Sequence, residues 1–425
     1  MKKTGSKIKK GKEEKKVKKE PKKKIEKPQK ISPEEEKASE IATHYGFSPL
    51  PETEVEKKDI EHAQKFLESR IKSLHPFKYK ADRFSGYLEE KIALIRSFLD
   101  KKFITLSQPV TAYYTGPMKG NPHMKKTPDE ETFNLEIIGS SKSISDAMVI
   151  ETAFVILEDR YPEEDLYVEI NSIGDKDSVV RFSRELQNFI KKEGNKLCKT
   201  CKEKIKKDAY AIFSCSDIKC KDVTEKAPKP MSYLSESSRN HFKEVLEYLE
   251  SLNIAYSINH KLIGSRSYCT DTVFEIKSRR DNTESVLGIG ERYNSLSKKI
   301  WGHRDIPAVS VALSIHPHFI TRKKLPKLKV EKSKFFFIQI GFDAKLKSLA
   351  LLETLRKAKV PVLQSLSKDK LSVQLQQAEK MEIPYILIMG QKEAMEKSIV
   401  VRNFSTRCQE TVGLDELIPY LKKLK

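Results

Sequence analysis

Long apolar segments are missing from this sequence. No apolar run approaches the length of about 18 residues that a membrane-spanning helix requires. The N-terminal lysines are not followed by an apolar stretch or a small-residue cleavage site, so a secretory signal is not expected. We therefore predict a cytoplasmic protein without membrane contact. Its 425 residues are enough for about two to three domains.

Arginine is also missing from residues 1–31, although this stretch is strongly basic. It holds 15 lysines against 4 glutamates, so a net charge of +11 out of the chain's +21 lies here. The few apolar residues cannot offset the entropy lost on ordering, and we predict a disordered Lys-rich tail. The tail is either a solvated segment or an arm that gathers RNA by releasing counterions. Lysine lacks the planar donor fork of arginine, so the arm is not expected to read an RNA sequence.

Cysteine is scarce, with six in the chain, yet four of the six fall within 23 residues. They form the pattern Cys198-x2-Cys201 followed by Cys215-x4-Cys220. Two such pairs supply the four thiolates that a tetrahedral zinc ion takes. The alternative is a set of reduced, partly buried thiols in an intracellular protein. Cys269 and Cys408 stand alone, and we expect them to be structural.

Helices and strands alternate irregularly after the tail. Ser32, Pro33 and the acidic residues behind them predict a capped helix start, and helical spacing returns over about 58–75 and 86–101. The strand patterns VTAYYTG, FNLEIIG and LYVEINSIG surround DAMVIETAFVILEDRY, a predicted helix with one apolar face. Another helix then leads to the strand patterns TVFEI, SVLGIGERYNSL and IPAVSVALSI. Regular single-helix crossovers are few, so the pattern predicts an α/β fold with an antiparallel-rich sheet.

The last quarter of the chain has a different texture. Residues 320–333 are basic and contain proline, which predicts a linker. Beyond them, short apolar segments alternate with helical ones from FFFIQIG to a final helix after Leu414. This pattern predicts a compact domain over 334–425 with a largely parallel sheet.

The order of these segments resembles the histidyl-tRNA synthetase family of class II aminoacyl-tRNA synthetases. The similarity extends from about Tyr45 to the end of the chain. Its landmarks are YYTGPM, FNLEIIG, INSIGD, the cysteine segment with the following KAPKPMSYLSESSRNHF, LGIGERYNSL, IPAVSVALSI, ILIMGQKE and VRNFSTRCQETVGLDEL. Each landmark is weak alone, and their shared order carries the resemblance.

The resemblance implies a domain organisation and partners. We expect a class II synthetase-like antiparallel-sheet core over 32–320, a cysteine-containing insertion at 195–225, and an anticodon-binding domain over 334–425. The resemblance also implies tRNA as a partner. It implies a homodimer formed through the family's first motif, which HYGFSPLPETE resembles.

Amino-acid activation places negative charge on phosphorus, and the family stabilises this charge with three arginines. This sequence has Gly120, Gly264 and a His-Pro-His segment at 316–318 where the resemblance places them. Lys119 and Arg266 are the nearest cations, and we take them as the candidate catalytic substitutes. A lysine, however, cannot make the two-pronged phosphate contact of an arginine.

Other positions retain the family's residues. The resemblance assigns substrate binding to Glu136, Tyr268, Arg292 and Tyr293, with Glu136 as the carboxylate for the substrate amino group. Two of these residues have an alternative reading. Glu136 is then a solvated strand residue, and Arg292 is a structural hydrogen-bond donor.

Two functional hypotheses follow. The first is a catalytically diverged protein that binds tRNA or another RNA in an accessory or regulatory role. Synthetase-like regulatory subunits of histidine biosynthesis also resemble the core, but they generally lack the anticodon-binding domain, so RNA binding is favoured. The alternative is a divergent, active histidine–tRNA ligase that uses ATP and Mg²⁺.

Overall fold

The computed structural model describes residues 33–71, 88–103, 108–122, 132–206, 208–215, 217–264, 268–280, 283–314, 333–365 and 368–424. The Lys-rich tail, Arg266, the 316–318 segment and almost all of the expected linker lie outside these residues. Among the helices of the described ranges, none has both the length and the apolar character needed to cross a bilayer.

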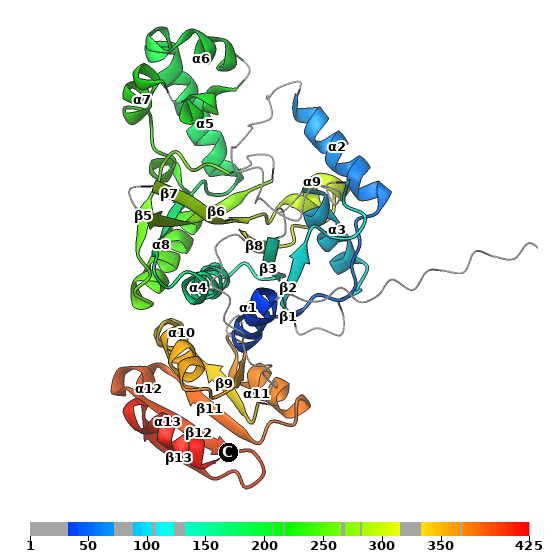
Figure 1. Cartoon of the computed structure of the whole chain (residues 1–425), viewed down its shortest axis with the longest axis vertical. Coiled ribbons are helices and arrows are strands. Elements are labelled where there is room, and N and C mark those ends of the chain that lie inside the picture. The colour runs from blue at the N-terminus through cyan, green and yellow to red at the C-terminus, as the bar shows by residue number, and fades with distance from the viewer. Residues whose placement is uncertain are drawn as a thin grey trace, which may run out of the picture. The chain divides into compact units, whose positions relative to one another are not determined.

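An eight-stranded sheet forms the core (Figure 1). Its strand order is β1-β2-β3-β8-β7-β6-β4-β5. Between the described strands, β1/β2 and β4/β5 pair in parallel and every other pair is antiparallel. The strands are β1 (Ser48–Pro49), β2 (Val110–Gly116), β3 (Thr132–Ile138), β4 (Asp165–Ser172), β5 (Tyr256–Ile258), β6 (Thr270–Arg280), β7 (Thr283–Arg292) and β8 (Ala308–Ser314). The predicted α/β fold with an antiparallel-rich core is confirmed.

Two helices, α4 (Ser143–Arg160) and α8 (Glu236–Ser251), pack on one face of this sheet. The sequence predicts a single apolar face for α4, but every residue from 143 to 157 except Phe154 is buried. The reason is that α4 lies against the sheet and also contacts α8 and α1. Helix α8 begins where the Ser235 side chain accepts a hydrogen bond from the Ser238 backbone N–H at 3.2 Å.

The opposite face of the sheet is covered by α3. Ile92 and Ile95 of this helix belong to the same apolar cluster as Ala112 of β2 and Ile138 of β3. Helix α3 also contacts α2 and α9. The helices of the N-terminal part and of this side are α1 (Pro33–His44), α2 (Lys57–Ile71), α3 (Leu88–Leu99) and α9 (Leu296–Trp301).

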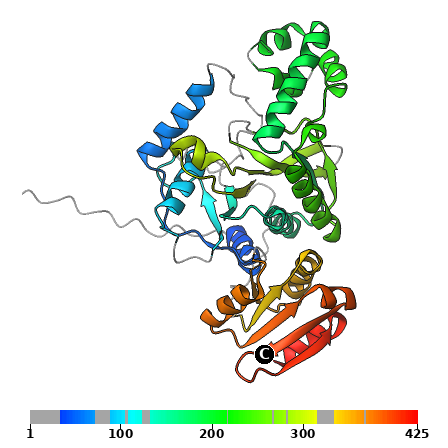
Figure 2. The same cartoon turned by 180° about the vertical axis from the view of Figure 1, so that it is seen from behind.

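The cysteine-containing insertion follows α5 (Lys176–Glu193). Figures 1 and 2 both show α5, α6 and α7 grouped together. The insertion consists of α6 (Lys199–Lys204), α7 (Ile218–Glu225) and 3₁₀ turns at Gly194–Lys196 and Ala209–Ser214, with a third turn at Pro230–Tyr233 after it. Leu197, Ile212 and Val223 of the insertion are buried in one apolar cluster with Phe182 of α5. The insertion therefore has a small core that it shares with α5.

A second sheet occupies the C-terminal part, with strand order β10-β9-β11-β12-β13. Pairings β10/β9 and β9/β11 are parallel, whereas β11/β12 and β12/β13 are antiparallel. The prediction of a largely parallel sheet is therefore wrong for one half, because the 390–397 connection from β11 to β12 and the 404–408 connection from β12 to β13 are both shorter than the crossover of about a dozen residues that parallel strands need. The elements are β9 (Phe335–Gln339), α10 (Phe342–Lys357), β10 (Val362–Gln364), α11 (Leu371–Lys380), β11 (Tyr385–Met389), α12 (Gln391–Glu396), β12 (Ser398–Asn403), β13 (Gln409–Gly413) and α13 (Leu414–Lys423).

Candidate functional site

One face of the large sheet is lined with polar side chains. On β3, Asn134 and Glu136 alternate with Leu135 and Ile137, which belong to the apolar core that contains the α4 side chains. Successive side chains of a strand point to opposite faces, so the polar set lies on the face that α3 covers. The polar side chains of β3 and β8 on this face are Thr132, Asn134, Glu136, Ser310 and Ser314, all of them buried. Buried polar groups need hydrogen-bond partners. The residues that pair with the polar side chains of this face therefore define the candidate site.

Glu136 and Tyr293 form the centre of this face. The Tyr293 hydroxyl donates to Glu136 Oε2 at 2.6 Å. Glu136 is 2% exposed, so the alternative of a solvated strand residue is wrong. Burial raises the pKa of Glu136 to about 7, against the opposing effects of the Lys91 ammonium and the Tyr293 hydrogen bond. A carboxyl with such a pKa can hold or release a proton near neutral pH.

Lys91 of α3 reaches the same face. Its Nζ donates to Ser310 Oγ at 2.7 Å and lies 3.1 Å from Glu291 Oε1. The same nitrogen is 4.7 Å from the centroid of the Tyr293 ring. Cys269, expected to be structural, is buried and its Sγ donates to Glu291 Oε2 at 2.7 Å.

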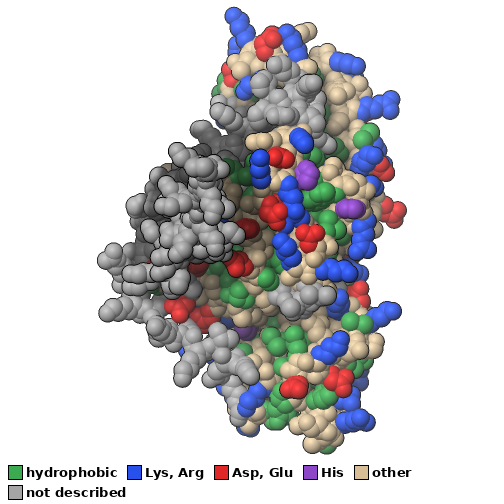
Figure 3. All heavy atoms as spheres, turned by 90° about the vertical axis from the view of Figure 1, so that its right-hand side faces the viewer, with side chains coloured by type: hydrophobic (Ala, Val, Ile, Leu, Met, Phe, Trp, Pro, Cys, Tyr) green, Lys and Arg blue, Asp and Glu red, His purple; other side chains and the backbone are tan. Residues whose placement is uncertain are grey.

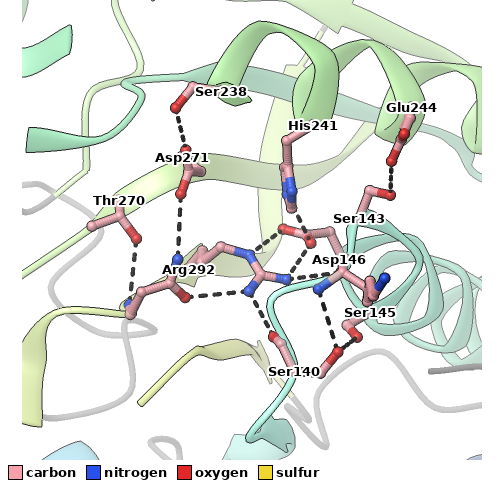
Figure 4. A network of polar contacts seen from close by, with 12 residues as sticks. Ser140, Ser143, Ser145, Asp146, Ser238, His241, Glu244, Thr270, Asp271 and Arg292 are labelled. Carbon is pink, nitrogen blue, oxygen red and sulfur yellow. Dashed lines mark hydrogen bonds and ion pairs between the residues drawn. The ribbon is translucent and has the colours of Figure 1, made fainter. Parts of the chain in front are cut away.

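Arg292 is held in a separate network with residues of α4 and α8 (Figure 4). Its Nε donates to Asp146 Oδ1 at 3.0 Å, and its Nη1 donates to the Ser140 carbonyl at 2.9 Å. His241 Nε2 lies 3.1 Å from Asp146 Oδ2. Burial alone raises the pKa of a carboxyl, but Arg292 and His241 hold the pKa of Asp146 well below its usual range. The guanidinium of Arg292 thus donates its hydrogen bonds to groups of the protein itself, as expected if Arg292 is a structural hydrogen-bond donor.

A further buried carboxylate, Glu90 of α3, anchors the segment that follows β2. It accepts hydrogen bonds from the Met118 backbone N–H at 2.7 Å, from Asn121 Nδ2 at 2.5 Å and from the Tyr114 hydroxyl at 3.2 Å. Burial raises the pKa of Glu90 even though these three donors oppose the shift. The GPM turn after β2 is therefore fixed to α3 by one side chain.

The candidate cation Lys119 lies in this turn but not in the buried site. Its side chain is 67% exposed, and its Nζ lies 3.4 Å from Glu54 Oε2. The next residue, Gly120, has φ of +84°, and a Cβ there would lie 2.2 Å from the Val55 carbonyl oxygen. No L-residue fits this position without movement of the backbone.

The second glycine of interest precedes β6. Gly264 has φ of +61°, and a Cβ there would lie 2.8 Å from Val273 Cγ1. Tyr268 is buried in the apolar cluster that also contains Tyr293 and Cys269, which brings it to the same side of the sheet as Glu136. Its role as a substrate-binding residue stays a prediction. For Arg266 no position is described.

Three residues of this face are missed by sequence reasoning. Glu90, Lys91 and Glu291 are charged yet at most 6% exposed. One signal was present, because Glu90 and Lys91 occur within the otherwise apolar pattern LEEKIALI. Charged residues on the core side of a helix are uncommon unless they are paired.

The four cysteines of the insertion meet as their spacing predicts. One sulfur from each of Cys198, Cys201, Cys215 and Cys220 lies within 4.8 Å of the other three. Cys198 Sγ and Cys215 Sγ are 3.9 Å apart, close to the edge of about 3.8 Å in a tetrahedron with zinc–sulfur bonds of about 2.3 Å. The Cys198 backbone N–H donates to Cys220 Sγ at 3.3 Å, a contact that orients a ligand sulfur. The donor set therefore fits a zinc ion.

Known proteins resemble this chain in sequence along most of its length. Residues 334–424 match the family described as "Anticodon binding domain". The chain is 30% identical over 386 residues to the histidine–tRNA ligase of Fervidobacterium nodosum, covering 88% of this chain and 89% of that protein. It is 30% identical over 358 residues to the histidine–tRNA ligase of Halothermothrix orenii, covering 83% and 85%. The apo histidyl-tRNA synthetase of S. aureus has a TM-score of 0.48 at 24% identity, with 93% of this chain and 98% of that chain covered.

The sequence relatives cover most of both chains. The chain therefore belongs to the histidine–tRNA ligase (histidyl-tRNA synthetase) family.

Proposed function

We propose that this chain is a diverged member of the family, one that binds tRNA or another RNA in an accessory or regulatory role and does not activate histidine. The observation that carries the proposal is the backbone conformation and the close surroundings of positions 120 and 264. Both are glycines in the left-handed region, where a side chain meets Val55 or Val273 at 2.2 Å or 2.8 Å. Neither backbone conformation suits the arginine that the resemblance places there.

The remaining cations are poor substitutes for these arginines. Lys119 is exposed and lies 3.4 Å from Glu54, so an acidic group already competes for its ammonium. Catalysis of phosphoryl chemistry depends on fixed cations in a site that excludes water, because charge stabilisation there is far stronger than in bulk solvent. An exposed lysine on a surface turn does not meet this requirement.

RNA binding is supported by the C-terminal part and by charge. Residues 334–424 match a family named for anticodon binding. The chain has a net charge of +21, of which +11 lies in residues 1–31. On the face shown in Figure 3, Lys and Arg side chains are scattered along the right-hand edge, with fewer Asp and Glu side chains between them. Such charge favours binding of a phosphate backbone through counterion release.

The alternative function is a divergent but active histidine–tRNA ligase that requires ATP and Mg²⁺. The retained pair Glu136 and Tyr293 favours it, since a buried carboxylate beside an aromatic ring suits an amino-acid ammonium group. In this alternative, Lys119 and Arg266 replace the arginines.

The proposal includes a structural zinc ion, a homodimer and a cytoplasmic location. Zinc would be held by Cys198, Cys201, Cys215 and Cys220, and it would stabilise the insertion, which has only a small core. Dimerisation is supported by the place of β1, which lies in the HYGFSPLPETE segment and forms one edge of the large sheet. The cytoplasmic location rests on the sequence alone.

The test measures RNA binding and chemistry on one preparation of the full chain. We expect the chain to bind tRNA and to show no histidine-dependent exchange of pyrophosphate into ATP. Deletion of residues 1–31 should weaken binding and lower the log–log salt slope by several units, because phosphate contacts set that slope. An unchanged slope would identify the tail as a solvated segment. Absence of binding to both tRNA and a total cellular RNA pool by the full chain would overturn the proposal.

A further inference from the structure

Three polar residues stand side by side across three neighbouring strands. Glu136 of β3 is directly opposite Ser310 of β8, and Ser310 is directly opposite Glu291 of β7. Opposite residues of antiparallel strands point to the same face, with their Cβ atoms about 5 Å apart. The face therefore carries a carboxylate on either side of one hydroxyl.

The ammonium of Lys91 lies over this row. It donates to the central Ser310 hydroxyl at 2.7 Å and lies 3.1 Å from Glu291. The Tyr293 ring, 4.7 Å from the nitrogen, adds an aromatic contact. Burial opposes the charged form, but Glu291 and Glu136 outweigh it and raise the pKa of Lys91 above its ordinary value. Two carboxylates, a hydroxyl and an aromatic ring are the groups that recognise a primary ammonium ion.

We propose that this row is a binding site for a primary ammonium group and that the chain's own Lys91 fills it. The amine of a free amino acid is thereby kept from Glu136 and Tyr293. The inference rests on the proposed function and deepens it, because it supplies a second, independent obstacle to the activation of an amino acid. The ligand class that the emptied site would take is an alkylammonium ion or the ammonium group of an α-amino acid.

The charge of the row supports this assignment. Lys91 and Glu291 are 2% and 6% exposed, so neither charge is solvated. The row contains two carboxylates and is faced by one ammonium. Its net charge is therefore negative unless Glu136 is protonated. A site of this kind loses much of its stability when its cation is removed, because a buried carboxylate is left unpaired.

The experiment truncates Lys91 to alanine and supplies the removed part of the side chain as a free amine in solution. Lys91→Ala removes three carbons and the ammonium, which together correspond to propylammonium. We expect Lys91→Ala to unfold at a lower Tm than the wild type and propylammonium chloride to raise that Tm saturably by several degrees. Wild type and Lys91→Met, whose side chain fills the space without charge, should shift by less than about 1 °C. Sodium chloride at equal ionic strength is the solvent control.

Two results would overturn the inference. One is a Tm of Lys91→Ala that does not respond to propylammonium, and the other is an equal response in Lys91→Met. Should Lys91→Ala fail to fold, the double variant Lys91→Ala/Glu291→Gln removes the unpaired carboxylate while Glu136 remains. Loss of the Lys91 cation removes an effect that lowers the pKa of Glu136, so calorimetric titration of that variant with propylammonium is run at several pH values between about 7 and 9 and should show binding at one site. No detectable heat of binding would also overturn the inference.

The result of this experiment can be distinguished from the result of the test of the proposed function. Histidine-dependent pyrophosphate exchange by the wild type would refute the proposed function whatever the amine does. A missing amine response in the Lys91 variants would refute only the assignment of the ammonium site.

Discussion

The Arg292 guanidinium and the Asp146 carboxylate pair inside the protein, with Nε donating to Oδ1 at 3.0 Å and neither side chain exposed to solvent. This pair joins the end of β7 to the start of α4. A residue that the resemblance assigns to substrate binding therefore connects the sheet to the helix that covers it.

Loss of either partner should destabilise the fold. We expect Arg292→Ala to lower the free energy of unfolding by about 3–5 kcal/mol, because the buried Asp146 carboxylate loses its guanidinium and keeps only the His241 contact. The matched control is Arg279→Ala, whose partner Glu284 at 3.2 Å forms an exposed pair, and its loss should be below about 1 kcal/mol. Urea denaturation measures both. Equal losses in the two variants would contradict the structural role of Arg292.

Glu136 should make stability depend on pH. Its pKa in the folded state is about 7, above the unfolded value of about 4.3, so the folded state binds the proton more tightly. The stabilisation is fully present below about pH 4.3 and is lost as the pH rises towards 7. Between about pH 5 and 8, the wild type should lose about 1–3 kcal/mol relative to Glu136→Gln. Parallel stability profiles of the two proteins would exclude a raised pKa.

Position 120 should reject any side chain. Gly120→Ala adds a Cβ at 2.2 Å from the Val55 carbonyl, whereas Gly302→Ala, also at positive φ, meets no atom within 4 Å. The two substitutions share the cost of the left-handed backbone, so their difference isolates the clash. Gly120→Ala should cost at least about 1 kcal/mol more than Gly302→Ala in urea denaturation. Similar losses would mean that the turn moves aside and that a side chain is tolerated there.

Zinc removal should loosen the insertion together with α5. We expect about one zinc per chain in the wild type and less than about half of that in Cys201→Ser, because tetrahedral thiolate sites need all four ligands. Limited proteolysis should then cleave within 195–225, and protection of α5 should fall because Phe182 shares its cluster with Leu197 and Ile212. Cys408→Ser is the control, since this exposed cysteine is outside the cluster. Full zinc content in Cys201→Ser would exclude the site.

Local patterns predicted the long strands β2, β3, β4, β6, β7 and β8 and the helices α3, α4 and α8, because these elements follow from apolar periodicity, whereas the short strand β1 and helix α5 were not predicted. The four cysteines also met as predicted, since a short spacing restricts where their sulfurs can lie. The contacts of the candidate site were harder to predict from the sequence. The contact of Lys91 with Ser310 joins residues 219 positions apart, and nothing in the sequence near either residue indicates it. The burial of Arg292 against Asp146 depends in the same way on how the sheet and α4 pack, so resemblance alone suggested a substrate role.

The most direct measurement of the central claim is the ATP–pyrophosphate exchange of the purified full-length chain with Mg²⁺ and histidine. The histidine–tRNA ligase of Fervidobacterium nodosum, assayed in parallel, is the matched positive control. We predict that histidine leaves the exchange rate of this chain at its background value while the control responds. A histidine-dependent rate on the order of 1 per second or faster would contradict the account.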